Sequence, residues 1–97
     1  MKAIFISFYQ AFYEEVLAVL EKNNIRGFTF WEEVRGRGGE KGEPHLGTHA
    51  WPTLNSAMLT FVPEKAVEGL LKDLKALDEG APKQGMRAFV LDARQGW

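Results

Sequence analysis

The feature that most constrains the fold is the short segment Ala3–Phe8, with the sequence AIFISF. Aromatic and β-branched residues in so short a run favour a strand over a helix. Its two alternating faces are both apolar, because isoleucine and phenylalanine side chains occur on one and alanine and phenylalanine on the other. This pattern is typical of a strand in the middle of a sheet that is covered on both sides.

The rest of the chain alternates between helical and strand-like patterns. Apolar residues at helical spacing predict helices over residues 10–23 and 63–79, and alternating segments predict further strands over 28–35, 56–62 and 86–92. The order β-α-β-β-α-β is that of the ferredoxin-like fold, an α+β architecture. We therefore expect one domain over residues 1–97, with a four-stranded antiparallel sheet and both helices on one face.

The predicted architecture leaves an apolar surface uncovered. Two helices cover only one face of a sheet, yet the alternating strand segments are apolar on both faces. Monomers rarely expose a whole sheet face of Phe, Trp, Leu and Met side chains. Another copy of the chain is the most economical cover, so the sequence predicts a homo-oligomer.

A stretch without any apolar period, Arg35–Ser56, separates the second and third predicted strands. It contains half of the glycines, two of the four prolines and both histidines. A loop of about 20 residues is uncommon in a compact domain and is usually functional when it occurs. We therefore predict that the flanking elements form a scaffold and that residues 36–56 carry the function.

Composition excludes several classes of function. A net charge of −1 and a pI near 6.1 give no reason to expect nucleic acid or an anionic membrane as a partner. The absence of cysteine excludes disulfides and thiolate metal sites. No apolar run approaches the roughly 20 residues that span a bilayer, and the N-terminal segment lacks the features of a signal peptide. We expect a cytoplasmic protein that does not insert into the membrane.

Two parts of the sequence suggest an anion site. In the run GRGGEKG, glycines allow backbone N–H groups to face an anion, and Arg37 and Lys41 add positive charge. Farther along, Arg87 follows Gly85 at the start of the last predicted strand. Phosphate binding is one interpretation of these residues. The alternatives are a solvated loop and a charged residue that protects a sheet edge.

Residue types also bear on metal binding and catalysis. His45 and His49 could share a divalent ion with Glu40 or Glu43 as a third ligand, or could make only local hydrogen bonds in a polar loop. Adjacent carboxylates on a strand point to opposite faces, and the serines have no evident base partner. The sequence therefore predicts a protein that is not an enzyme.

Several motifs resemble the PII signal-transduction family. The segment NIRGFT over residues 24–29, followed by EVRGRGGEKG over 33–42, resembles the family's strand entry and the base of its long T-loop. VPEKAVEGLLKDL is similar to its second helix, and GMRAFVLD to its B-loop and fourth strand. The resemblance implies a homotrimer of ferredoxin-like subunits with nucleotide sites in the clefts between them. It also implies a T-loop, residues 36–56 here, that changes conformation with ligand and docks on a target protein.

The resemblance also assigns candidate nucleotide contacts. It places Thr29 beside the adenine, the glycines of the loop base beside the nucleotide, and Gly85 and Arg87 where the B-loop offers a glycine and a phosphate-binding lysine. Glu40 stands where the family usually has glutamine, near the phosphates or a metal. With the loop's two cations, the full candidate set is Thr29, Gly36, Arg37, Gly38, Glu40, Lys41, Gly85 and Arg87.

The sequence also departs from the PII pattern. The 36–56 loop contains no tyrosine for nucleotidylation, and only Arg94 stands near the place of a basic pair that grips the outer phosphates. AMP or ADP is therefore expected rather than ATP, in a non-enzymatic sensor that signals to a membrane transporter or efflux component. The fold is also similar to that of CutA proteins of divalent-metal tolerance. That similarity implies an alternative function, a metal-binding protein that uses His45 and His49.

Overall fold

The computed structural model describes residues 1–37, 44–45, 54–81 and 85–97. Four strands form an antiparallel sheet in the order β2-β5-β1-β6. They are β1 (Lys2–Tyr9), β2 (Thr29–Val34), β5 (Asn55–Val62) and β6 (Arg87–Asp92). Each predicted strand boundary lies within one residue of the observed one, because the alternation of side chains follows the pleat closely.

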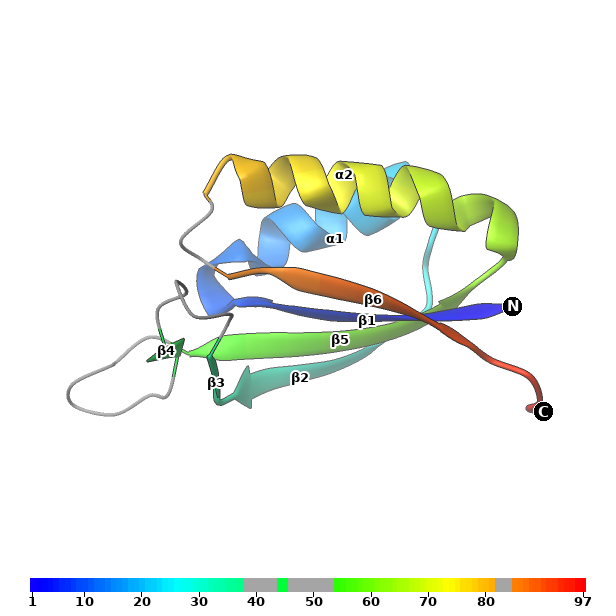
Figure 1. The fold of residues 1–97 in the computed structure, drawn as a ribbon, viewed down its shortest axis with the longest axis horizontal. Helices are drawn as coiled ribbons and strands as arrows, with labels where there is room; N and C mark the ends of the chain where they lie inside the picture. The colour runs from blue at the N-terminus through cyan, green and yellow to red at the C-terminus, as the bar shows by residue number, and fades with distance from the viewer. Residues whose placement is uncertain (38–43, 46–53, 82–84) are drawn as a thin grey trace.

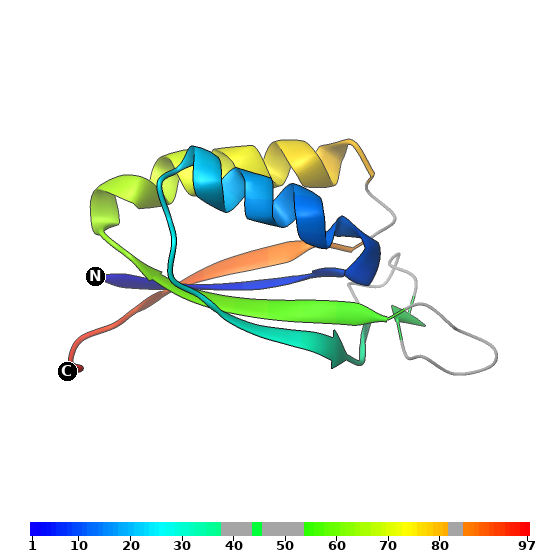
Figure 2. The same ribbon diagram turned by 180° about the vertical axis from the view of Figure 1, so that it is seen from behind.

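Both helices lie on the same face of the sheet (Figures 1 and 2). Short 3₁₀ turns, η1 (Gln10–Phe12) and η2 (Glu64–Ala66), lead into α1 (Tyr13–Lys22) and α2 (Val67–Glu79). The predicted ferredoxin-like α+β fold is confirmed. Both termini lie at one end of the sheet, and the end of β2 and the start of β5 lie at the other, here called the loop end (Figure 1).

The end of α1 is set by a residue in the left-handed conformation. Asn24 has φ 59°, which asparagine tolerates better than most residues. The turn lets the Ile25 N–H donate to the Leu20 carbonyl at 2.9 Å, so Ile25 folds back into the core. The chain then leaves the helix layer and enters β2.

The core lies between the helices and one face of the sheet, here called the covered face. Its members are apolar residues of alternating strand positions and of the inward stripes of the two helices. The buried cluster comprises Ile4, Ile6, Phe8, Val16, Leu20, Ile25, Met58, Val62, Leu70, Leu74 and Met86. The apolar residues at helical spacing and those at alternating strand positions thus pack together in one core layer.

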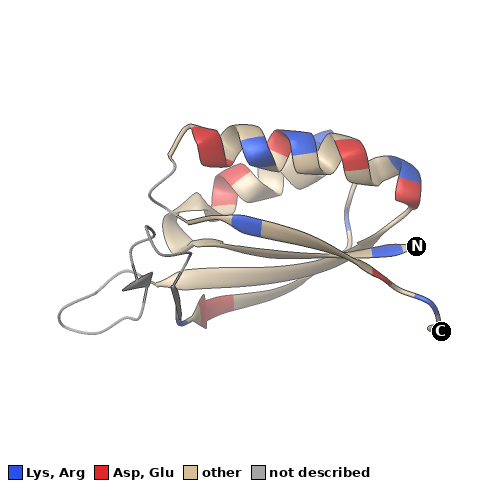
Figure 3. Ribbon diagram, in the orientation of Figure 1, with Lys and Arg blue, Asp and Glu red and all other residues tan. Residues whose placement is uncertain are grey.

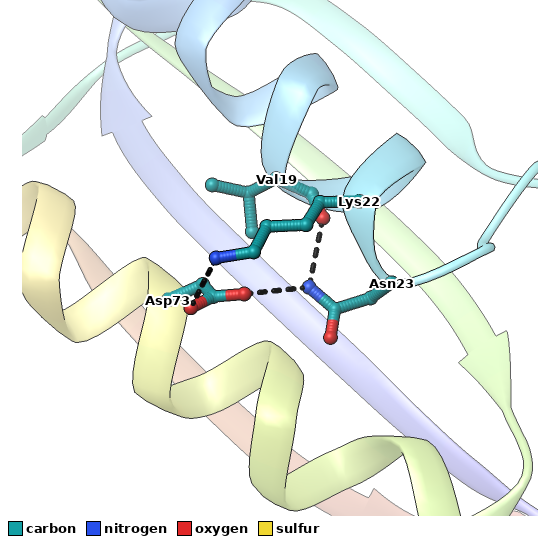
Figure 4. A network of polar contacts seen from close by, with 4 residues as sticks. All are labelled: Val19, Lys22, Asn23 and Asp73. Atoms are coloured by element: carbon teal, nitrogen blue, oxygen red, sulfur yellow. Dashed lines mark hydrogen bonds and ion pairs between the residues drawn. The ribbon is translucent and has the colours of Figure 1, made fainter.

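A polar network joins the two helices (Figure 4). Asn23 Nδ2 donates to the Val19 carbonyl at 2.9 Å and to Asp73 Oδ2 at 3.0 Å, and Lys22 Nζ lies 3.4 Å from Asp73 Oδ1. The hydrogen bond from Asn23, reinforced by Lys22, lowers the pKa of Asp73 below its ordinary value. A Cβ on Gly69 would lie 2.9 Å from Asn23 Oδ1, so glycine allows the helices to approach at this point.

The opposite face of the sheet, here called the open face, is apolar and exposed. Phe5, Trp31, Phe61, Phe89 and Leu91 are between 37% and 59% exposed, and they alternate with the buried residues of the same strands. Charged residues lie mainly on the helices and near strand ends, while the middle of the sheet carries none (Figure 3). The structure therefore contains the uncovered apolar surface that the sequence predicts.

Simple alternation along β2 places Val34 on the same face as Phe30, and this prediction was wrong. The register of β2 on β5 shifts between Trp31 and Val34, and Val34 is paired with Asn55. Such an irregularity reverses the alternation of side chains that follow it. Val34 therefore lies on the open face, where it lines a cavity together with Trp31.

The segment expected to be a continuous loop, residues 36–56, also contains strands. β3 (Gly36–Arg37) and β4 (Pro44–His45) form a two-stranded antiparallel sheet, and β5 already begins at Asn55. These short strands have no apolar alternation, so no sequence pattern predicts them.

Candidate functional site

The predicted site residues are only partly covered by the structure. Gly38, Glu40, Lys41 and His49 lie outside the described residues. Gly36 and Arg37 lie in β3 and His45 lies in β4, where Gly36 pairs with His45 and Arg37 with Pro44. This pairing places the start of the 36–56 segment beside residues 44–45 of the same segment.

Thr29 and Arg87 are separated by the width of the sheet. Thr29 begins β2 at one edge and Arg87 begins β6 at the other, with β5 and β1 between them. Strands lie about 4.8 Å apart, so these edges are roughly 14 Å apart. One chain therefore does not bring the predicted adenine contact and the predicted phosphate contact together.

The residues before β6 suit the approach of a phosphate. Gly85 has φ 72°, a conformation that residues with a Cβ adopt only with strain. Arg87 is exposed, and its Nη1 donates to the Met86 carbonyl at 2.7 Å, which leaves other guanidinium N–H groups for a ligand. Arg94 lies beyond the far end of β6 and cannot act beside Arg87 within one chain.

A clamp of hydrogen bonds holds the base of the 36–56 segment. Ser56 Oγ donates to the Glu32 carbonyl at 2.7 Å, and Gln10 Nε2 reaches the same carbonyl at 3.4 Å. The Gln10 backbone N–H also donates to the Leu54 carbonyl at 2.9 Å. Gln10 and Ser56 thus tie the strand that enters the segment to the strand that leaves it, at the register shift of β2.

Thr60 acts in the same way at the other end of β2. It is fully buried, and its Oγ1 donates to the Gly27 carbonyl at 2.6 Å, two residues before Thr29. Gln10 and Thr60 were not predicted from the sequence, and Ser56 was considered only as a nucleophile. A signal was present, because Ser56 and Thr60 are polar residues on an otherwise apolar strand face, and such residues need a hydrogen-bond partner when buried.

The loop end of the open face contains a cavity of about 300 Å³. Phe5, Trp31, Val34 and Ala57 form its apolar wall, and Ser7, Arg35 and Asn55 supply polar groups. Asn55 is almost fully buried, and its Nδ2 lies 3.5 Å from Ser7 Oγ. Apolar walls with a few polar groups are typical of small-molecule sites.

Some kinds of site and segment do not occur in the described part of the chain. Among residues 1–37, 44–45, 54–81 and 85–97, no group of three or more His, Asp or Glu residues could hold a metal ion. The predicted pair of histidines includes His49 and so remains a prediction. Within the same ranges, no helix combines the length and the apolar character that crossing a membrane requires.

No protein-family model matches the sequence, and no curated protein matches it. Solved structures do match. A structure of CPII, a nitrogen regulatory PII-like protein from Thiomonas intermedia K12 bound to ADP, AMP and bicarbonate, matches with a TM-score of 0.80 and 21% identity, covering 99% of this chain and 88% of that one. CPII bound to ADP and bicarbonate matches with a TM-score of 0.80 and 22% identity over the same shares.

A second protein shows the same likeness. A protein from Thermus thermophilus, named as a PII-like signaling protein, matches with a TM-score of 0.64 and 21% identity, covering 93% of this chain and 83% of its own. Identities of this size establish a shared fold and leave the ligand and partner to be tested. The chain therefore has the fold of PII-like proteins.

Proposed function

We propose that this chain is a PII-like regulatory protein that binds AMP or ADP in clefts between the subunits of a homotrimer. The observation that carries the proposal is the placement of Thr29 and Arg87 on opposite edges of one sheet. Residues that serve one nucleotide must meet, so the β2 edge of one copy must approach the β6 edge of the next.

The open face supplies the reason for assembly. Phe61, Phe89 and Leu91 are each more than half exposed. Burying them in an interface removes apolar surface from water, which favours association. A contact between two different edges is heterologous, and a heterologous contact that closes makes a ring. A closed ring of three copies covers every open face and pairs every β2 edge with a β6 edge.

The residues present fit an adenine nucleotide. The Thr29 hydroxyl could accept a hydrogen bond from the adenine amino group, and the backbone at Gly85 allows close approach of a phosphate. Arg37 and Arg87 would supply positive charge, with Gly36, Gly38, Glu40 and Lys41 completing the base of the segment in this proposal. In the sequence only Arg94 stands near the place of the basic pair that grips the outer phosphates in PII proteins, so the proposal favours AMP and ADP over ATP. The ADP and AMP bound to CPII support this choice of ligand.

Signalling in this proposal passes through residues 36–56. A nucleotide at their base must favour one conformation of the segment over another, since otherwise no signal results. The clamp of Gln10 and Ser56 fixes where the segment leaves the sheet, so changes at the nucleotide are expressed beyond it. The partner would be a membrane transporter or efflux component, reached from the cytoplasm, and no catalytic step is involved.

Calorimetric titration with AMP, ADP and ATP tests the ligand. Arg87→Gln should weaken AMP or ADP binding by about tenfold or more, because a charge-assisted hydrogen bond is lost. Arg26→Gln is the matched control, because Arg26 is exposed in the segment between α1 and β2. No measurable binding of any of the three nucleotides at millimolar concentration would contradict the proposal.

Sedimentation tests the assembly. The expected species has three times the 11.0 kDa mass of one chain at micromolar concentration. A monomer that binds ADP with undiminished affinity would refute the placement of the site between subunits.

The metal alternative, with His45 and His49 as ligands, remains a prediction from the sequence. None of the residues that the structure describes favours it over the nucleotide proposal. Titration with Cu, Zn, Co and Ni ions decides it, because binding that survives His45→Ala combined with His49→Ala excludes this site.

A further inference from the structure

Trp31 places an exposed aromatic ring next to the predicted adenine contact. It lies two residues after Thr29 on β2, and the register of β2 shifts only beyond Trp31, so both side chains lie on the open face. Their Cα atoms are about 7 Å apart along the strand. Thr29 is exposed, and Trp31 is 45% exposed. A flat base that reaches the Thr29 hydroxyl therefore also reaches the indole ring.

The cavity at the loop end of the open face leaves room beside the indole. Ala57 is paired directly with Trp31 and forms the floor of the cavity, because its methyl group is the shortest side chain in the lining. On the next strand, β1, the exposed ring of Phe5 lines the same cavity. Two aromatic residues with an alanine on the strand between them leave space for a planar ring. The volume of about 300 Å³ matches the lower end of the range for small-molecule sites.

The polar lining of the cavity argues against simple packing. Tryptophan side chains commonly pack in interfaces, and the proposed trimer covers the open face with another copy. If apolar side chains of that copy filled the cavity, Ser7 and Arg35 would lose water without gaining a partner, which is costly. A nucleobase has an apolar face for the indole and polar ring atoms for such groups. The cavity thus suits a base better than the apolar side chains of a neighbouring copy.

We propose that Trp31 selects the base of the bound nucleotide. The base stacks on the indole ring over Ala57, with Phe5 on its far side and Thr29 beside its amino group. A purine has two fused rings and covers more of the indole than a pyrimidine does, so stacking favours purine nucleotides. The inference rests on the proposed nucleotide site and names the residue that gives that site its preference for a purine.

Calorimetric titration with ADP and CDP tests this preference. CDP carries the same ribose and phosphates as ADP and also has an amino group on its base, so the comparison isolates the ring system. The unmodified chain should bind ADP about tenfold more tightly than CDP, or better, which is the size of effect that a base stacked on an aromatic ring provides.

Trp31→Leu and Phe61→Leu form a matched pair, because each removes one exposed aromatic ring from the open face and keeps apolar bulk for assembly. Phe61 lies outside the lining of the cavity. Trp31→Leu should weaken ADP binding by about tenfold and CDP binding by less than about threefold, so the preference falls. Phe61→Leu should leave the ratio of the two affinities within about twofold of the unmodified chain. A purely structural role of Trp31 would weaken both ligands equally.

A second measurement leaves Trp31 in place. The sequence contains three tryptophans, and Trp51→Phe combined with Trp97→Phe keeps only Trp31. ADP should quench the fluorescence of Trp31, because a stacked base contacts the excited indole, whereas inorganic pyrophosphate should not. Emission that saturating ADP leaves unchanged would overturn the proposal, even if Trp31→Leu failed to fold.

Two further results would refute the role of Trp31. One is an unchanged ratio of ADP to CDP affinity in Trp31→Leu. The other is an equal loss of both ligands together with loss of the trimer in sedimentation, which would assign Trp31 to the interface alone. Both results require that the unmodified chain binds ADP. If it binds no nucleotide, the proposed function itself is wrong and this inference falls with it, so the two failures are distinguishable.

Discussion

The two faces of the sheet are built from alternate residues of the same strands, yet one face is buried and the other is exposed to solvent. On the covered face, Ile4, Ile6 and Met58 are fully buried beneath the helices. On the open face, Phe61 and Phe89 are 54% and 59% exposed. Both faces are apolar in sequence, so hydrophobicity alone does not distinguish them. The difference arises because one chain has two helices, and these cover only one face of the sheet.

The polar residues of the two faces differ as well. On the covered face, Ser56 and Thr60 are buried and donate to carbonyls at the two ends of β2. On the open face, Ser7 and Asn55 lie at the loop end and line a cavity. Polar groups under the helices thus position a strand, while those on the open face line a cavity.

The largest expected effect comes from the covered face. Phe8→Ala should lower the free energy of unfolding by about 3–5 kcal/mol, because it leaves a cavity in the buried cluster. Urea denaturation at a concentration where copies are separated measures this effect. Phe89→Ala is the matched control and should cost much less under the same conditions. If both variants lose the same free energy of unfolding, the two faces contribute equally to the stability of one chain, and the comparison is wrong.

The next effect belongs to the open face. Phe89→Glu should weaken self-association by about a hundredfold or more, because a charge would be buried without a partner in the assembled state. The variant should stay folded by circular dichroism, since Phe89 lies outside the buried cluster. Light scattering across a dilution series measures the change, with Lys72→Glu on α2 as control. An unchanged oligomer would show that the open face is covered in another way.

Sequence patterns predicted the elements well and the connections between them less well. Strand and helix bounds followed from alternation and helical spacing, which local chemistry imposes. The register shift near Val34 and the β3–β4 pairing depend on which backbone groups meet in space, and no local pattern of apolar residues reveals them.

The candidate nucleotide contacts were chosen from the sequence by residue type and remain predictions, and their arrangement in space could not be derived from it. The glycine at 85 and the arginine at 87 stood out by residue type and position. Strand order decided that Thr29 and Arg87 lie on opposite edges, and strand order is set only when the chain has folded.

A smaller effect is expected at the clamp of Gln10 and Ser56, which holds the base of the 36–56 segment. Ser56→Ala should lower the free energy of unfolding by about 1–2 kcal/mol, because the Glu32 carbonyl loses its shorter hydrogen bond. Ser7→Ala on the open face should change it by less than about 0.5 kcal/mol, as is usual for partly exposed positions. Urea denaturation compares the two. If Ser56→Ala is as mild as Ser7→Ala, the clamp does not hold the base of the 36–56 segment.

The smallest effect concerns the helix layer that covers one face. The Asn23 hydrogen bond, with Lys22, lowers the pKa of Asp73, so the folded chain binds this proton less readily than the unfolded chain. The stabilisation that results is fully present above the pKa of Asp73 in the unfolded chain, which is about 4. It is lost as the pH falls through the lower pKa of Asp73 in the folded chain. Urea midpoints between pH 7 and about pH 2.5 should therefore fall less steeply for Asp73→Asn than for the unmodified chain.

Asp92 provides the comparison for this pH effect, because its pKa is also lowered, by the hydrogen bond and charge of Lys2 at the edge of the sheet. This pair is largely exposed on the Asp92 side, so salt should weaken its contribution. Asp92→Asn should change the pH dependence at low salt and little at high salt, whereas the Asp73 effect should persist because Asn23 is a neutral donor. Equal salt sensitivity would mean that the network between the helices is only a surface ion pair and does not help to hold the layer over the covered face.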